Sequence, residues 1–168
     1  RHDRPVRSHT AQGALEAMDT AGVQRAVVYT QHAVEFDGPE GNELLLDMID
    51  GEPRFVPQFA INPGYDDMET FSAEIREHDV RSVRMTPKLH DYPFLDWVVG
   101  PWLDWLSDAK VPLWLNAWQI DPAELYDAIR DNPNLHVVLS EVHYQHSNWA
   151  VPLLASLPNV SVEISRFV

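Results

Sequence analysis

Short apolar runs rich in valine, leucine and isoleucine alternate with helical runs along the whole 168-residue chain. Successive runs begin roughly 20 to 30 residues apart, the size of one strand-plus-helix unit. This alternation predicts a mainly parallel sheet with right-handed crossovers, and both an open doubly wound sheet and an arc of a barrel satisfy it. The expected strands are Ala26–Thr30, Phe55–Ile61, Ser82–Thr86, Pro112–Ala117, Val137–His143 and Val160–Ser165.

Apolar residues at helical spacing fill the intervals between these strands. The first helix is expected to end at Gly22, a residue that readily adopts the left-handed conformation of a helix cap. Asp121 followed by Pro122 predicts a helix start, because the carboxylate can cap the first turn and proline suits the first helical position. In the last helix, Trp149–Leu157, we expect Pro152 in the first turn, where no backbone donor is lost.

No glycine-rich phosphate loop follows any expected strand, which argues against a nucleotide-binding sheet. Several other segments indicate which family of proteins the chain resembles. They are Ala14–Val28, Asn42-Glu43 with Pro53–Pro63, Val80–Met85, Val111–Asn116, Pro133–Glu141 and Leu157–Glu163. Taken in this order, they resemble the amidohydrolase-related family of metal-dependent hydrolases, and the match covers nearly the whole chain.

The resemblance implies a single domain over residues 1–168 with an α/β fold of the TIM type, a (β/α)8 barrel of which about six units are present. The family's first strand ends in a His-x-His metal-binding pair, which would precede Arg1. Its eighth strand carries a metal-binding aspartate, which would follow Val168. Such an arc leaves two edge strands unpaired, so we expect a longer natural chain or a second chain that closes the sheet.

Active sites of these barrels lie at the C-terminal ends of the strands. There, Asn116 stands where the family usually has a metal-binding histidine, and Glu141 stands where it often has a second one. Because a neutral amide is a poor zinc ligand, two routes stay open. One uses a divalent metal (Zn, Mn or Fe) with Glu141 and His143 as the best candidate ligands, and the other is metal-free, as in some lactonase-like relatives. Ser165 and Arg166 are further strand-end candidates.

Glu141 and His143 are two residues apart on an expected strand, so both would point to the same face. A carboxylate beside an imidazole can act as an acid or base near neutral pH, or can bind one metal. The structural alternative is a buried Glu141 held by hydrogen bonds, with His143 already in the following loop. Together with Asn116, these two residues are the candidate catalytic residues.

Arg84, Lys88 and His90 lie at the end of the fourth expected strand and are candidates for substrate binding. Cations at this place suit a carboxylate-bearing substrate, because arginine can hold a carboxylate through two parallel hydrogen bonds. The alternative for Arg84 is an ion pair inside the barrel, with Glu141 as a candidate partner, since an unpaired buried charge is costly.

Trp118 and His32 complete the substrate-binding candidates. Trp118 is expected on the same face as Asn116 and could form the wall of a pocket for a ring, and His32 could line its mouth. The chain has no cysteine and no Gly-x-Ser-x-Gly motif, so the familiar acyl-enzyme routes have no support.

Acidic residues outnumber basic ones by 26 to 12, giving a formal net charge of -14. Such a surface repels nucleic acid and anionic membranes. No apolar run approaches the ~20 residues of a membrane span, and the sequence from Arg1 to Pro5 lacks the apolar core of a signal peptide. We therefore expect a small-molecule substrate, a cytoplasmic location, and neither nucleic acid nor membrane as partner, with homo-oligomerisation as a weaker expectation.

The leading hypothesis is a hydrolase that cleaves an ester, lactone or amide bond of a small, carboxylated or cyclic substrate with activated water. A non-oxidative decarboxylase is the alternative that the same family permits. A barrel that has lost catalysis and binds a small molecule or a protein partner is the rival from another class. A third hypothesis is that the chain is a complete open α/β domain of this length.

Overall fold

The computed structural model describes residues 10–164, and the expectations for Arg1 to Pro5, Ser165 and Arg166 lie outside this range. The strands are β1 (Ala26–Val28), β2 (Phe55–Pro57), β3 (Phe59–Ile61), β4 (Val83–Met85), β5 (Leu113–Asn116), β6 (Val137–Ser140) and β7 (Val160–Val162). The helices are α1 (Ala11–Ala21), α2 (Gln31–Glu35), α3 (Gly38–Ile49), α4 (Met68–Glu77), α5 (Asp96–Ala109), α6 (Pro122–Arg130) and α7 (Ser147–Ser156), with a 3-10 turn, η1 (Tyr144–His146), before α7.

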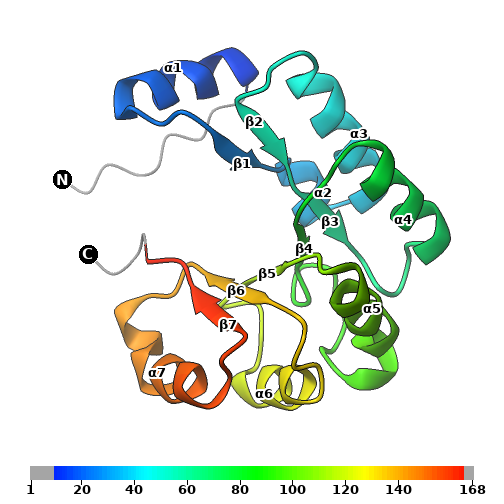
Figure 1. The fold of residues 1–168 in the computed structure, drawn as a ribbon, viewed down its shortest axis with the longest axis vertical. Coiled ribbons are helices and arrows are strands. Elements are labelled where there is room, and N and C mark those ends of the chain that lie inside the picture. The colour runs from blue at the N-terminus through cyan, green and yellow to red at the C-terminus, as the bar shows by residue number, and fades with distance from the viewer. Residues whose placement is uncertain (1–9, 165–168) are drawn as a thin grey trace.

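All strand pairs in this range are parallel, in the order β1-β2 and β3-β4-β5-β6-β7. Figure 1 shows the strands in an arc with the helices on its outer side. The chain therefore has the α/β architecture of a TIM-type barrel, present as an open arc, and the expected alternation of strand and helix is confirmed.

Alternating residues of the central strands face opposite sides of the sheet. Val83, Met85, Leu113 and Leu115 are completely buried against the helices. The residue between the first two, Arg84, points to the inner side of the arc, together with its register neighbour on β5. The inner side thus carries the polar groups, while the hydrophobic core lies between sheet and helices.

One expected strand, Phe55–Ile61, is divided in two at Gln58. Beyond this break, the side chain of Asn42 takes the place of a neighbouring strand: its Nδ2 donates to Ala60 O (3.1 Å) and its Oδ1 accepts from Ala60 N (3.0 Å). The helix α3, which carries Asn42, begins at Gly38, because Asp37 caps it by accepting from Glu40 N.

Several predicted helix boundaries are confirmed, and one is wrong. Gly22 caps α1 with a φ of 70°, and Asp121 caps α6 by accepting from Ala123 N at 2.8 Å. Pro152 lies in the middle of α7 and not in its first turn, because η1 and α7 begin earlier than the apolar pattern indicated. The short helix α2 was not expected from the sequence.

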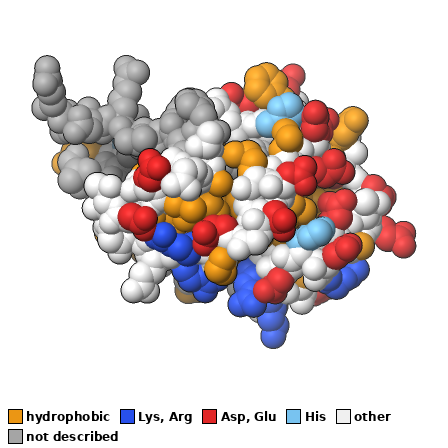
Figure 2. Space-filling model, turned by 90° about the horizontal axis from the view of Figure 1, so that it is seen from above, with side chains coloured by type: hydrophobic (Ala, Val, Ile, Leu, Met, Phe, Trp, Pro, Cys, Tyr) orange, Lys and Arg blue, Asp and Glu red, His pale blue; other side chains and the backbone are white. Residues whose placement is uncertain are grey.

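The described residues contain no helix that is long and apolar enough to cross a lipid bilayer. The face in Figure 2 carries more acidic than basic side chains, in line with the net charge of -14 of the whole chain.

Candidate functional site

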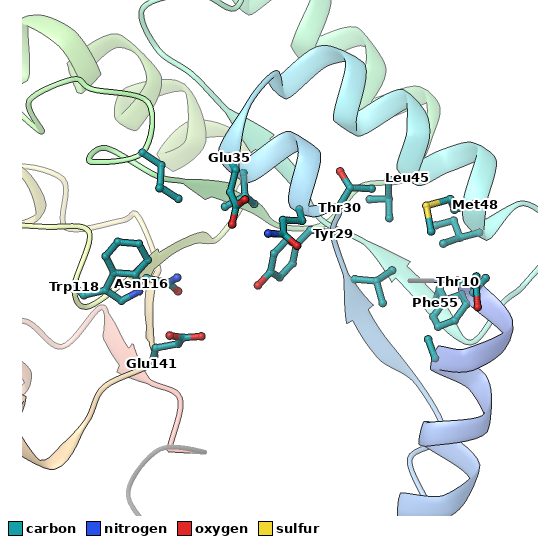
Figure 3. A pocket seen from close by; sticks show the side chains of 17 residues that line it. Thr10, Tyr29, Thr30, Glu35, Leu45, Met48, Phe55, Asn116, Trp118 and Glu141 are labelled. Atoms are coloured by element: carbon teal, nitrogen blue, oxygen red, sulfur yellow. The ribbon is translucent and has the colours of Figure 1, made fainter. Parts of the chain in front are cut away.

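A pocket of about 530 Å³ extends from the ends of β5 and β6, past the end of β1, to α1 and α3. Asn116, Trp118 and Glu141 line one side, and Tyr29 and Glu35 face them across the pocket (Figure 3). The strand ends thus supply one carboxylate, an amide and two aromatic rings to this space, and α2 supplies a second carboxylate. A pocket of this size can hold a small ring compound.

Glu141 reaches the pocket through an unusual backbone conformation. The strand β6 ends at Ser140, and Glu141 has a φ of 53°, in the left-handed region. This conformation costs a residue other than glycine about 1 kcal/mol. The expectation that Glu141 and His143 share one strand face is therefore wrong: the chain turns at Glu141, Val142 is completely buried, and His143 lies in the following loop.

Asn116 belongs to a row of buried polar side chains on the inner side of the arc. Its Oδ1 accepts from Arg84 Nη1 at 3.2 Å and from Ser140 Oγ. Arg84 Nε in turn donates to Gln58 Oε1 at 2.9 Å, and Gln58 Nε2 donates to Ser82 Oγ at 3.0 Å. The network joins residues of successive strands across the arc.

Arg84 is only 4% exposed, and the ring of Tyr29 covers its guanidinium with a centroid distance of 4.0 Å. Burial lowers the pKa of Arg84, and Tyr29 and Glu141 oppose this shift. Within the described residues Arg84 forms no ion pair, so the expected pairing with Glu141 is not observed. Its hydrogen bonds go to neutral amide oxygens, so a buried positive charge stands directly behind Asn116 and Tyr29.

Trp118 follows β5 in a turn and is 43% exposed at the edge of the pocket. Lys88 Nζ donates to Trp118 O at 2.6 Å, and the backbone amides of Lys88 and Leu89 donate to Gln119 Oε1. These bonds join the loop after β4 to the loop after β5. Lys88 therefore holds Trp118 in place and is not itself among the residues that line the pocket.

The three candidate histidines do not line the pocket. His32 Nε2 lies 3.0 Å from Glu40 Oε2 on the surface of α2 and α3. His90 Nδ1 is 3.3 Å from Thr86 Oγ1, and burial lowers the pKa of His90. His143 meets His146 edge-on, with 5.8 Å between the ring centroids and 71° between the ring planes. Their roles in substrate binding or catalysis stay predictions that the geometry does not favour.

Tyr29, Glu35 and Gln58 were missed by the sequence reasoning. Tyr29 is part of a predicted strand end, so the rule that selected Arg84 and Asn116 could have selected it. Glu35 reaches the pocket from α2, a helix with no clear sequence pattern. Gln58 stands in an apolar run, and a polar residue at this place signals a buried hydrogen-bond network.

Within residues 10–164, no three His, Cys, Asp or Glu side chains are arranged to hold a metal ion. Asn116 Oδ1 already accepts two hydrogen bonds, which leaves it a poor metal ligand. Glu141 is the one strand-end carboxylate among residues 10–164 that lines the pocket. The described residues thus do not fit the metal centre that the family pattern implies.

A parallel arc, with polar residues at the carboxyl ends of its strands lining one end of a pocket, defines the chain as a TIM-barrel protein. A model of the Amidohydrolase family matches residues 2–167, so the chain belongs to this family. A comparison with curated protein sequences gave no match.

Two solved structures share the fold. An uncharacterised TIM-barrel protein from Bordetella bronchiseptica is 18% identical with a TM-score of 0.72, and the match covers 91% of this chain and 58% of that protein. A dihydroorotase from Campylobacter jejuni is 17% identical with a TM-score of 0.51, and the match covers 75% of this chain and 39% of that enzyme. The chain thus spans less than two thirds of either relative, and at these identities the likeness shows the fold alone.

Proposed function

We propose that this protein is a hydrolase that cleaves an ester, lactone or amide bond in a small, carboxylated or cyclic substrate. The observation that carries the proposal is the meeting of Glu141, Asn116 and the buried Arg84 at one end of the pocket. Membership of the Amidohydrolase family supports hydrolysis as the class of reaction.

The charge distribution supports a substrate that carries a carboxylate. Arg84 bonds only neutral oxygens, Gln58 Oε1 and Asn116 Oδ1, so its positive charge is not cancelled by an ion pair within the described residues. A charge held in a site of low dielectric attracts an anion more strongly than the same charge in water. The rings of Tyr29 and Trp118 offer apolar walls for the rest of a flat or cyclic molecule.

Glu141 is the proposed general base. Its carboxylate takes a proton from a water molecule while the water oxygen attacks the carbonyl carbon of the substrate. The carbon–heteroatom bond then breaks, and the proton passes from Glu141 to the leaving group. General base catalysis of this kind contributes about 10²- to 10⁴-fold in rate. The left-handed backbone that aims Glu141 at the pocket supports this role, since strained residues gather at functional sites.

The test is a hydrolysis screen of the full-length protein against small carboxylated esters and lactones in ¹⁸O-labelled water. We expect labelled oxygen in the acid product, and a kcat at least about 10²-fold lower in Glu141→Gln with KM changed much less. Glu43→Gln is the matched control, because Glu43 is exposed on α3 away from the pocket. Unchanged kcat in Glu141→Gln would refute the general-base role.

Two other outcomes would replace the proposal. Release of carbon dioxide without label uptake would make the protein a decarboxylase, and tight binding without turnover would make it a non-catalytic barrel. Elemental mass spectrometry of the same preparations adds a separate readout for Glu141. A general base leaves the zinc, manganese or iron content of Glu141→Gln equal to wild type, whereas a metal ligand does not.

A further inference from the structure

The side-chain amide of Asn116 has its orientation fixed by two donors. Its Oδ1 accepts from Arg84 Nη1 (3.2 Å) and from Ser140 Oγ, the residue paired with Asn116 in the β5–β6 register. A guanidinium has donors only and no acceptor. The side of the amide that faces Arg84 must therefore be the oxygen, whichever way the amide is first drawn.

The residues behind the amide are fixed as well. Arg84 Nε donates to Gln58 Oε1 (2.9 Å), and Gln58 Nε2 donates to Ser82 Oγ (3.0 Å). Gln58 and Arg84 are 1% and 4% exposed, so neither can turn to solvent for other partners. Buried hydrogen bonds of this kind polarise one another, and the positive charge at one end makes the N–H groups of Asn116 better donors.

The nitrogen of the same amide faces the pocket. Asn116 is one of the residues that line it, and Figure 3 shows its side chain directed into the space between Trp118 and Tyr29. Within residues 10–164, Asn116 Nδ2 makes no hydrogen bond. A polarised donor therefore points into the pocket without a protein acceptor among the described residues.

We infer that Asn116 Nδ2 donates a hydrogen bond to a carboxylate oxygen of the substrate, and that Arg84 and Ser140 are positioning residues that hold the amide for this contact. Asn116 is then a specificity-determining donor, and neither a base nor a metal ligand. The positive charge of the buried Arg84 lies directly behind Asn116, which makes the Asn116 end of the pocket the place for the substrate's carboxylate. The inference rests on the proposed function for its site, but it concerns binding and not turnover.

Benzoate is the probe, because it is an unreactive ring compound with one carboxylate. The experiment is a titration of the isotope-labelled full chain, followed through the side-chain amide signals in NMR. The two Nδ2 proton signals of Asn116 are assigned by their loss in Asn116→Asp. Aspartate at this position still accepts from Arg84 and Ser140 but donates nothing, so the fold is expected to persist. Asn148→Asp is the matched control, since it makes the same charge change on the exposed side of α7.

We expect benzoate to move the Asn116 signals, and we expect Asn116→Asp to weaken benzoate binding about tenfold to a hundredfold, while Asn148→Asp stays within about twofold. Absence of benzoate binding, unmoved Asn116 signals, or equal affinity in Asn116→Asp would each overturn the inference. If Asn116→Asp does not fold, the Nδ2 signals are assigned instead by correlating them with the backbone signals of Asn116 in the wild-type protein, and the wild-type titration decides.

The binding result and the hydrolysis screen can fail separately. Benzoate binding through Asn116 without any turnover would leave this inference standing and refute the proposed hydrolase. Hydrolysis with no benzoate contact at Asn116 would leave the proposed hydrolase standing and refute this inference.

Discussion

Gly41 in α3 has no room for a side chain, and Gly41→Ala should destabilise the protein although alanine favours helices. A Cβ at this position would overlap the backbone N and Cα of Ala33 and come within 2.6 Å of its Cβ. The obstacle is the backbone of α2, which no change of rotamer can move away. Thr30 ties the two helices together at the same point, donating to Gly41 O at 2.8 Å and accepting from Ala33 N at 3.1 Å.

Two opposing effects determine the size of the change. Replacing glycine by alanine inside a helix gains about 1 kcal/mol. Forcing extra atoms into a packed contact costs about 1–3 kcal/mol, and a backbone obstacle together with the Thr30 hydrogen bonds favours the upper end. The net loss in the free energy of unfolding is therefore about 2 kcal/mol. For a domain of this size it corresponds to a Tm about 4–8 °C lower.

Urea unfolding of the full-length protein, followed by circular dichroism, measures this difference. Gly38→Ala in the first turn of the same helix is the control, because the nearest atom to its new Cβ is Ala60 O at 3.5 Å, an ordinary contact. Its stability should stay within about 0.5 kcal/mol of wild type. If Gly41→Ala were as stable as Gly38→Ala, the close packing of α2 on α3 would be refuted, together with the placement of Glu35 at the pocket.

Three further predictions concern a buried acid, a sheet edge and the strained turn. Burial raises the pKa of Asp66 from 3.8 to about 6, so the folded state binds more protons at this residue than the unfolded state. The free energy of unfolding, compared with that of Asp66→Asn, should therefore fall from about pH 4 to pH 6 and level off above pH 6. A difference in urea unfolding that does not change with pH would contradict this. Asn42→Ala leaves the buried N–H and C=O of Ala60 without partners and should cost about 2–4 kcal/mol in the same assay, and a loss under 1 kcal/mol would disprove the role of Asn42 as a substitute strand. Glu141→Asn and Glu141→Gln both remove the carboxylate, but asparagine tolerates the left-handed backbone better than glutamine. The asparagine variant should therefore unfold at a higher urea concentration. The opposite order would show that the turn at Glu141 is not strained.

The fold was predictable because its signals are local. Apolar runs and helical spacing follow from which faces are buried, and the caps at Gly22 and Asp121 follow from backbone sterics and hydrogen bonding. The break at Gln58 could not be predicted in this way, since it depends on Asn42, 16 residues earlier in the chain, reaching Ala60 in place of a neighbouring strand. Pro152 was misplaced because a helix boundary set by η1 leaves no apolar pattern.

The location of the site could be predicted from the sequence, but the geometry of its residues could not. The rule that strand ends carry chemistry selected Arg84, Asn116, Trp118 and Glu141, and all four lie in or directly behind the pocket. Strand alternation failed for His143, because it assumes that the strand continues, and one left-handed residue redirects the chain. No sequence pattern predicts a left-handed turn at this position when the residue is a glutamate and not a glycine.

Two departures from ordinary local rules occur at the pocket, although positive φ values are also found away from it, at Asp79, Asp91 and Lys110. Glu141 adopts a backbone conformation that favours glycine, and Arg84 is buried with neutral partners where a carboxylate partner would stabilise it. Each departure costs stability, and each does one thing for the pocket: the first aims a carboxylate into it, and the second leaves a positive charge behind the Asn116 amide. Departures of this kind are expected to persist where function requires them. Replacing Glu141 by glycine, or giving Arg84 a carboxylate partner, should therefore raise the free energy of unfolding and abolish ligand binding. This joint outcome separates a functional site from a tolerated irregularity of folding.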